Sequence, residues 1–174
     1  MNLYRLALIA VAVLWAAASG LAGSTGAASS QAQSARDGKI AFVRNGTLFT
    51  VASDGSGVRR LQIVSKLRNL DCDGPAWAPD GRRLAFTAYH EGDGVLFVRS
   101  ATGRANALGS TGRGEGGVSW SPDGKQLVVG AGGDEPSLGL YSVSSGGATA
   151  IGVEGFDPAW SPDGAAIAYR FGRG

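Results

Sequence analysis

Three aspartates recur along this sequence, and repeated carboxylates are groups that could together hold a metal ion. Asp80, Asp123 and Asp163 each stand in a Pro-Asp-Gly triplet, 43 and 40 residues apart. Carboxylate oxygens suit hard cations such as Mg²⁺ and Ca²⁺, so a ring of these side chains on one face of the fold is one interpretation. The other is turn chemistry, because an Asp in a turn accepts hydrogen bonds from its own backbone. The sequence favours turns, and we predict no metal site here.

Two further features bear on catalysis and nucleotide binding. His90 is the only histidine, and it stands in Tyr89-His-Glu-Gly-Asp-Gly94, which we expect to be an exposed loop rather than part of a Ser-His-Asp arrangement. The Gly-x-Ser-x-Gly pattern of α/β-hydrolases does not occur. Gly112-Arg-Gly-Glu-Gly-Gly117 matches the glycine spacing of dinucleotide-binding loops. It leads into a predicted strand where that fingerprint must open a helix, so we expect a connecting loop.

Asp71-Cys-Asp-Gly74 resembles the start of an EF-hand calcium loop. Counted from Asp71, however, the sixth position is Ala76 instead of glycine and the twelfth is Arg82 instead of glutamate. Cys72 is the only cysteine, so it forms no disulfide within the chain. We expect it to be buried and unreactive, with pairing to another molecule as the alternative. The sequence therefore predicts no catalytic, cofactor-binding or metal-binding residue.

The aspartates belong to a longer repeated phrase that must position them. It reads Pro75-Ala-Trp-Ala-Pro-Asp-Gly81, Val118-Ser-Trp-Ser-Pro-Asp-Gly124 and Pro158-Ala-Trp-Ser-Pro-Asp-Gly164, and a short apolar run follows each copy. Short apolar runs then alternate with turn clusters, which is typical of an all-β fold. Four short antiparallel strands in each unit of about 40–45 residues is the layout of a β-propeller blade.

Each repeat is expected to contain four strands, which we name a to d. Strand a carries the tryptophan, and Pro-Asp-Gly makes the hairpin to strand b. We expect strand b at 40–42, 84–86, 127–129 and 167–169, strand c at 47–51, 94–98 and 139–143, and strand d at 58–63, 105–108 and 148–151. The strand b runs are apolar on successive residues, which predicts sheets packed on both faces. The tryptophans then fill the space between blades; a row of aromatic binding platforms is the alternative.

The repeated phrase resembles the WD-repeat-like blades of TolB-type propellers. Asp54-Gly-Ser-Gly57, which stands before Arg59-Arg-Leu61, resembles the c–d turn of that family, and the resemblance covers residues 38–170. It implies an exported propeller that usually has six blades. In TolB this propeller belongs to the Tol–Pal system of the cell envelope and binds other proteins. Similar propellers precede catalytic domains in some serine peptidases.

The N-terminus has the pattern of an export signal. Arg5 precedes the apolar run Leu6–Ala18, and small residues follow. The 13-residue run is shorter than the ~18 residues of a membrane span, although an uncleaved anchor is the alternative. We predict a signal peptide and leader at 1–30, a flexible linker at 31–37 and a partial propeller at 38–174. Cleavage between Gly20 and Ala35 would leave no stable membrane span.

The number of blades is too small for a closed ring. Strands b, c and d come first, then two full repeats, then strands a and b, which makes three to four blades. Six blades of about 42 residues would need about 250 residues. The leader also leaves no room for the separate domain that TolB carries before its propeller. Either the chain is a fragment, or another copy or partner covers the open ends.

The charge and the missing catalytic groups narrow the functional classes. The net charge is +2, too small to indicate nucleic-acid binding. Residues 36–104 hold 11 basic and 7 acidic side chains, which are either solvated turn residues or a polarity that guides a partner or second copy. We predict an exported, non-enzymatic module that binds proteins, in the cell envelope or outside the cell, without a cofactor. The alternatives are the propeller of a truncated serine peptidase and a self-assembling structural protein.

Overall fold

Strands make up all the regular secondary structure that is described for this chain. The computed structural model describes residues 38–63, 70–100, 103–112, 116–131 and 137–171, and in them it shows thirteen strands and no helix. The all-β prediction is therefore confirmed. The predicted signal peptide and leader (1–30) and linker (31–37) lie outside the described residues.

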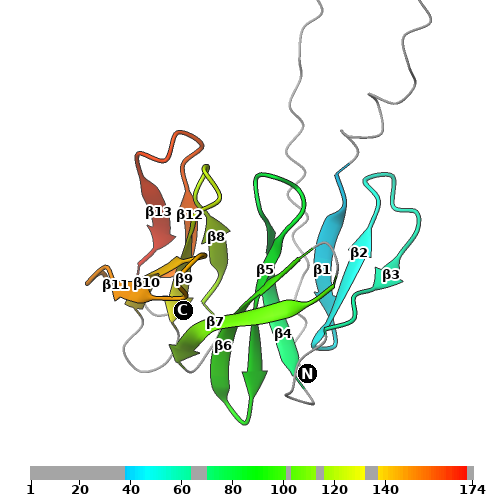
Figure 1. Ribbon diagram of the computed structural model, residues 1–174, viewed down its shortest axis with the longest axis horizontal. Helices are drawn as coiled ribbons and strands as arrows, with labels where there is room; N and C mark the ends of the chain where they lie inside the picture. Colours follow the sequence, from blue (N-terminus) through cyan, green and yellow to red (C-terminus); the bar gives the residue numbers. More distant parts are fainter. Residues whose placement is uncertain (1–37, 64–69, 101–102, 113–115, 132–136, 172–174) are drawn as a thin grey trace, which may run out of the picture.

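The strands form four antiparallel sheets that follow one another along the chain (Figure 1). The first sheet contains β1 (Ile40–Arg44), β2 (Thr47–Val51) and β3 (Arg59–Arg60). The second contains β4 (Asp71–Trp77), β5 (Leu84–His90), β6 (Asp93–Arg99) and β7 (Ala105–Gly112). The third contains β8 (Val118–Trp120), β9 (Gln126–Ala131), β10 (Ser137–Ser142) and β11 (Ala148–Ala150). The fourth contains β12 (Phe156–Trp160) and β13 (Ile167–Arg170).

In every sheet the strands pair in the order of the sequence, so the predicted a-b-c-d blade is confirmed. The second and third sheets are complete blades, with orders β4-β5-β6-β7 and β8-β9-β10-β11. Within the described residues, the first sheet has strands b, c and d, and the fourth has strands a and b. The array is thus an unclosed series of blades, as the strand count predicts.

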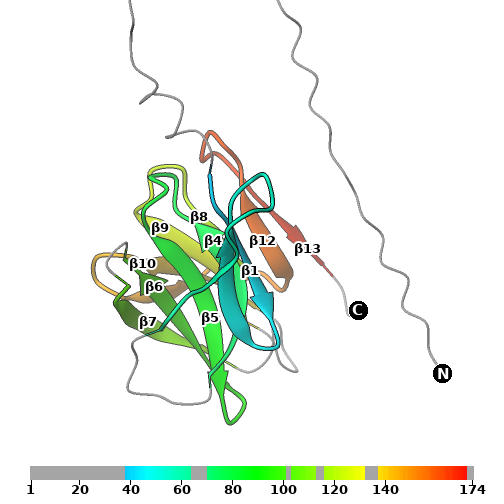
Figure 2. The ribbon, with the colours of Figure 1, turned by 90° about the vertical axis from the view of Figure 1, so that its right-hand side faces the viewer.

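The Pro-Asp-Gly triplets make the a–b hairpins. The N–H groups of Gly81, Gly124 and Gly164 each donate to the carbonyl three residues earlier at 2.9 Å. These glycines have φ of 65°, 66° and 73°, a left-handed conformation that glycine adopts without steric cost. All three hairpins consequently reverse the chain in the same way, and they lie at the same end of the array (top in Figures 1 and 2).

Several strand bounds differ from the predicted ones, and three regions differ most. Strand β3 has two residues where 58–63 was predicted. Strand β7 runs past the predicted Leu108 because two register irregularities let it continue along β6. The expected exposed loop around His90 is instead a tight hairpin, since β5 runs to His90 and β6 begins at Asp93. Its two turn residues, Glu91 and Gly92, both have positive φ, at 53° and 90°, as a type I′ turn requires.

The hydrophobic core consists of two clusters, each lying between neighbouring sheets. The cluster between the first two sheets contains Leu48, Cys72, Leu84, Phe86, Ala88 and Phe97. The cluster between the second and third contains Ala78, Ala85, Leu96, Val98, Trp120, Leu127, Val129 and Tyr141. Strand β5 supplies both clusters, because alternate side chains of a strand point to opposite faces. The predicted packing of strand b on both faces is confirmed for this blade.

Trp120 shows how one blade is fixed to the next. It is buried in the second cluster, and its Nε1 donates to the carbonyl of Ala76 in the preceding blade at 2.9 Å. The Arg83 guanidinium lies over its ring, 4.8 Å from the centroid. The interpretation of the repeated tryptophan as a packing residue is thus confirmed here. Trp77 and Trp160 are half-buried, and their buried Nε1 atoms have no hydrogen-bond acceptor among the described residues.

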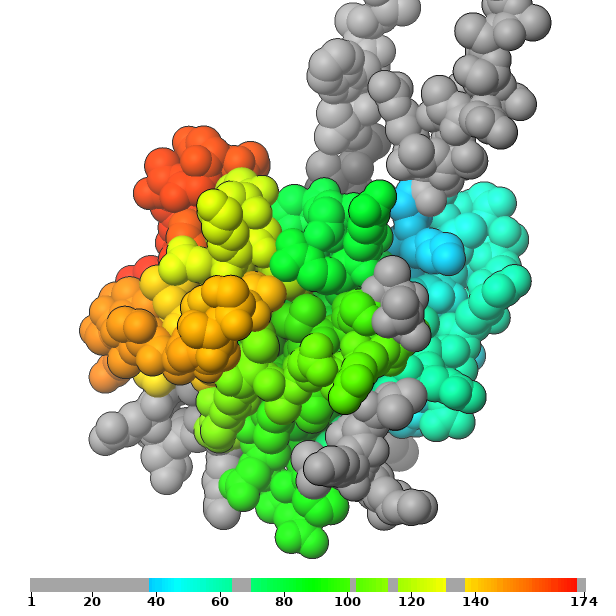
Figure 3. Space-filling model, in the orientation of Figure 1, coloured from blue at the N-terminus to red at the C-terminus, as the bar shows by residue number. Residues whose placement is uncertain are grey.

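The two incomplete sheets lie on opposite sides of the array, with the complete blades between them (Figures 1 and 3). Large hydrophobic side chains are exposed in these end regions. They are Ile40 (52%), Val58 (52%), Tyr169 (44%) and Phe171 (76%) among the described residues. The complete blades contribute none to this set, because each has a neighbour on both sides.

We expect Phe86→Ala to lower the free energy of unfolding by about 3–5 kcal/mol, because it leaves a cavity between the first two sheets. Phe86 is fully buried and stacks on Phe97 with ring centroids 5.5 Å apart. Urea denaturation followed by tryptophan fluorescence measures the loss. The control is Tyr169→Ala, an exposed aromatic that should cost less than about 1 kcal/mol. Equal losses in the two variants would contradict this location of the core.

Candidate basic cleft

A cleft of about 650 Å³ lies between the first and second sheets, and it is lined by basic side chains. The basic residues are Lys39, Arg59, Arg60, Arg82 and Arg99. Trp77 and Leu61 supply apolar surface, and Asp80 is the acidic residue of the lining. The cleft therefore combines several positive charges with an aromatic ring.

Four separate segments bring these residues together. Lys39 directly precedes β1, and the pair Arg59–Arg60 forms the short edge strand β3. Arg82 lies in the Pro-Asp-Gly hairpin between β4 and β5, and Arg99 ends β6. The hairpin and the c–d turn of a blade lie at the same end of the sheet, so two adjacent blades place all five at one rim.

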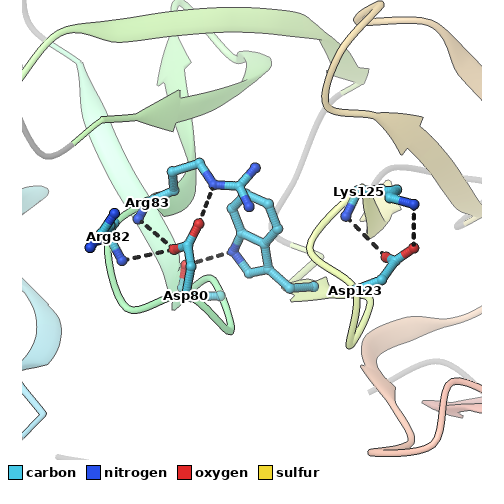
Figure 4. Close-up of polar contacts among 7 residues, drawn as sticks. Asp80, Arg82, Arg83, Asp123 and Lys125 are labelled. Atoms are coloured by element: carbon cyan, nitrogen blue, oxygen red, sulfur yellow. Dashed lines mark hydrogen bonds and ion pairs between the residues drawn. The ribbon is translucent and has the colours of Figure 1, made fainter.

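The negative charge of Asp80 is already engaged within its own turn (Figure 4). Its carboxylate accepts hydrogen bonds from the backbone N–H groups of Arg82 at 2.8 Å and Arg83 at 3.2 Å, and from Arg83 Nε at 2.8 Å. Burial raises the pKa of this carboxyl, but the hydrogen bonds outweigh burial and hold the pKa below its usual value. Asp80 thus remains ionised and paired with Arg83, which is not one of the five cleft residues.

The five basic side chains of the cleft make no ion pair in the part of the chain that the structure describes. Arg99 is half-buried and donates from Nε to the carbonyl of Gln62 and from Nη1 to that of Ser100, both at 3.4 Å. These bonds hold its guanidinium at the cleft without neutralising it. Positive charges that share a low-dielectric wall attract an anion, and arginine binds carboxylates through a two-pronged hydrogen-bonded pair.

The neighbouring clefts have a different charge. A cleft of about 390 Å³ between the second and third sheets has Arg83 as its charged lining residue. Another, of about 470 Å³ beside the β8–β9 hairpin, contains Arg83, Lys125 and Asp123. Arg83 pairs with Asp80 at 2.8 Å, and Lys125 lies 3.9 Å from Asp123 (Figure 4). The unpaired positive charge therefore belongs to the first cleft and is not a general property of the blades.

The other repeated aspartates also act within their turns. Asp123 accepts hydrogen bonds from the Ser121 hydroxyl at 2.7 Å and the Lys125 N–H at 3.0 Å. Asp163 accepts the equivalent hydrogen bonds, from the Ser161 hydroxyl at 2.6 Å and from the Ala165 N–H at 3.0 Å. The serine hydroxyl, followed by the backbone N–H, lowers the pKa of each carboxyl. These contacts are the ones that the turn interpretation predicts.

The remaining residues considered from the sequence lie in strands or loops. His90 ends β5 opposite Asp93. The segment 71–74 is not a calcium loop but part of β4, where Asp71 and Cys72 pair with β5. Gly112 ends β7, and 113–115 of the expected loop lie outside the described residues. Gly116 lies so close to the backbone of Gly130 that a side chain there would collide with it.

Cys72 is buried, as predicted, and it lies in the cluster between the first two sheets. Burial, with a smaller contribution from the nearby Asp71, raises the pKa of its thiol to about 11. The thiolate is the reactive form, so the raised pKa disfavours reaction of this thiol at neutral pH. Among the described residues, no group of three or more His, Cys, Asp or Glu side chains could hold a metal ion. The described residues also contain no helix that is long and apolar enough to cross a membrane.

Comparison with solved structures identifies the fold. TolB from Acinetobacter baumannii matches 75% of this chain with 24% identity and a TM-score of 0.62. TolB from Agrobacterium tumefaciens matches 75% with 19% identity and a TM-score of 0.61. The fold is a β-propeller, as in TolB. An oligogalacturonate lyase in complex with manganese matches 76% with 18% identity and a TM-score of 0.58.

The matched region spans part of each of these proteins. It covers 35% of the Acinetobacter TolB, 49% of the Agrobacterium TolB and 42% of the lyase. No family model matches the sequence, and a search of curated proteins finds no relative. The resemblance to TolB-type propellers that the repeats predicted is therefore confirmed in the fold.

Sequence reasoning missed the basic cleft, although one signal for it was present. The excess of basic residues in 36–104 was interpreted mainly as solvated turns. The structure places five of these residues at one cleft because their segments, up to 60 residues apart, meet at the contact of two blades. The tandem Arg59–Arg60 was the local part of the signal.

We expect Ser161→Ala to raise the pKa of Asp163 toward its usual value, because the strongest hydrogen bond to the carboxylate is lost. NMR titration of the carboxyl carbons measures it, and Asp123, which keeps its serine, is the internal control. A carboxyl with a lowered pKa in the folded state stabilises the fold above its unfolded pKa, and this stabilisation is lost as the pH falls through the folded value. The free energy of unfolding of the unsubstituted protein should therefore decrease as the pH falls below about 4. An unchanged Asp163 titration would contradict the assignment.

Proposed function

We propose that this chain is an exported, non-enzymatic β-propeller module that binds a protein partner, and that an acidic segment of the partner occupies the basic cleft. The observation that carries the proposal is the set of five basic side chains around Trp77, none of which makes an ion pair in the described residues. The cleft opens at the rim of two blades, where an extended segment has access to it.

The chemistry of the cleft favours an acidic peptide. Aspartate and glutamate side chains offer carboxylates to the arginines. Trp77 and Leu61 offer an apolar surface to the methylene groups of the same side chains. An exposed ion pair contributes only about 0.2–1 kcal/mol, so binding needs several pairs together. The resulting affinity should decrease as salt screens the charges.

We propose a non-enzymatic role from the sequence, because Gly-x-Ser-x-Gly does not occur and His90 is the single histidine. Export is proposed from the pattern of Arg5 and the apolar run Leu6–Ala18, and the shared fold with TolB supports it. The shared fold with an oligogalacturonate lyase gives a competing ligand of the same charge, an acidic oligosaccharide.

Binding of labelled octaglutamate, followed by fluorescence anisotropy, tests the cleft. We expect saturable binding that weakens with added salt, and none with octalysine. The double variant Arg59→Ala/Arg60→Ala should weaken binding by about 2- to 30-fold, from two pairs of about 0.2–1 kcal/mol each.

The matched control compares one turn position in two blades. Arg82→Ala removes a cleft charge, whereas Lys125→Ala removes the charge at the same position of the next hairpin. Only the first should reduce octaglutamate binding. Equal effects of the two variants, or tighter binding of polygalacturonate than of octaglutamate, would contradict a peptide-binding cleft.

Export predicts a processed chain outside the cytoplasm. When the full sequence is expressed in a bacterial host, the chain recovered from the periplasm or medium should begin between Gly20 and Ala35. N-terminal sequencing or intact mass measures this. Deletion of Leu6–Ala18 should retain the chain in the cytoplasm. Recovery of an intact chain from the cytoplasm, with none outside it, would contradict export.

A further inference from the structure

The basic cleft has an apolar floor, which Trp77 and Leu61 form. Both side chains are partly buried, and they pack against the core cluster between the first two sheets. Their remaining surface lines the cleft. The floor is therefore continuous with the hydrophobic core, and an apolar group placed on it would extend that core.

Trp77 presents carbon to the cleft rather than its polar atom. Its Nε1 is buried, whereas the residue as a whole is only partly buried. The part of the indole that lines the cleft is thus the apolar part of the ring, and the side chain of Leu61 is apolar throughout. A carboxylate placed on this floor would lose water without gaining a hydrogen-bond donor from either side chain, which costs free energy.

The next interface between blades shows how such a floor can be covered. Trp120 ends β8 as Trp77 ends β4, so the two tryptophans are equivalent. The Arg83 guanidinium lies 4.8 Å from the centroid of the Trp120 ring, and Trp120 is only 6% exposed. Lys39 directly precedes β1 as Arg83 precedes β5, and it is the equivalent cation at the first interface. Within the described ranges Lys39 makes no cation–π contact, so it does not cover Trp77 in this way.

The positive charges of the cleft belong to two walls, one from each sheet. Arg59 and Arg60 form β3 of the first sheet, whereas Arg82 and Arg99 belong to the second. The core cluster on which the floor rests lies between these sheets, so the floor separates the two walls. A segment whose carboxylates reach both walls must therefore cross the floor.

We propose that the cleft selects an acidic segment with an apolar residue at its centre. This central side chain lies on Trp77 and Leu61, and the acidic residues on either side of it pair with the two walls. The inference rests on the acidic-peptide binding proposed above, and it names the residue of the partner that gives the cleft its specificity. A uniformly acidic segment offers only the methylene groups of its side chains to the floor.

An aromatic residue fits the floor particularly well. Two aromatic side chains in contact contribute free energy beyond the apolar area that they bury, and Trp77 supplies one of the two rings. Charge alone attracts many polyanions, and salt screens that attraction. An apolar contact between the charges is not screened, so it distinguishes one acidic segment from another under conditions where charge pairing is weak.

Two labelled heptapeptides of equal charge test the inference. Each has three glutamates, one central residue and three more glutamates, and the central residue is phenylalanine in one peptide and serine in the other. By fluorescence anisotropy we expect the phenylalanine peptide to bind about 3- to 30-fold more tightly, from partial burial of its side chain. Added salt should weaken the binding of both peptides while their affinity ratio stays nearly constant.

Substitutions in the floor should change this ratio. Trp77→Leu, which makes the floor smaller, should lower it by about twofold or more. The matched control is Trp160→Leu, because Trp160 is also half-buried with a buried Nε1 but does not line the cleft. Leu61→Asn, which puts a polar group on the floor, gives a second variant if Trp77→Leu does not fold. A ratio measured on one variant does not depend on the fraction of that variant that is folded.

Equal affinities of the two heptapeptides for the unsubstituted chain would overturn the inference. The same fall in the ratio for Trp77→Leu and Trp160→Leu would also overturn it. The proposed function is judged separately by octaglutamate. If octaglutamate binds and the two heptapeptides bind equally, the acidic-peptide function stands and the central apolar residue does not. If none of the three peptides binds, both proposals are wrong.

Discussion

A propeller blade has two apolar faces, and this requirement for a neighbour on each side governs the molecule. The second sheet meets it fully, because β5 sends Phe86 into one cluster and Ala85 into the other. Each end sheet has a neighbour on one side only. The exposed large hydrophobic side chains of the described residues lie in these end sheets and the segments beside them. Stability of repeat proteins is the sum of what each unit and each contact between neighbours contributes. An array with two open faces therefore lacks contacts that a closed ring would have.

The repeated phrase predicted the fold because its residues act locally. Proline and glycine set the hairpin, and Trp120 packs between two blades, so the order and pairing of the strands followed from the spacing of the repeats. The strand boundaries were harder to predict, because they depend on pairing with strands elsewhere in the chain. Strand β7 extends to Gly112 by pairing irregularly with β6, which no pattern in its own sequence indicates. The Glu91-Gly92 hairpin was missed since glutamate is not a usual residue at positive φ.

The cleft could not be predicted in the same way, because charge depends on which neighbours a side chain meets. Sequence showed an excess of basic residues, but not which of them would remain without an acidic partner. In the first hairpin Asp80 pairs with Arg83, so Arg82 contributes an unpaired charge to the cleft. The position equivalent to Arg83 is Gln126 in the second hairpin and Ala166 in the third, and neither can form this ion pair.

The pairing of each strand with the next along the chain has a consequence for how the protein folds. Hairpins between sequence neighbours close short loops, which costs little chain entropy and allows rapid formation. The second sheet, with its hairpin from Leu84 to Arg99, pairs along its full length and has neighbours on both sides. It can act as the nucleus on which the adjacent sheets condense. The outermost strands would then be the last to form and the first to open in native-state hydrogen exchange.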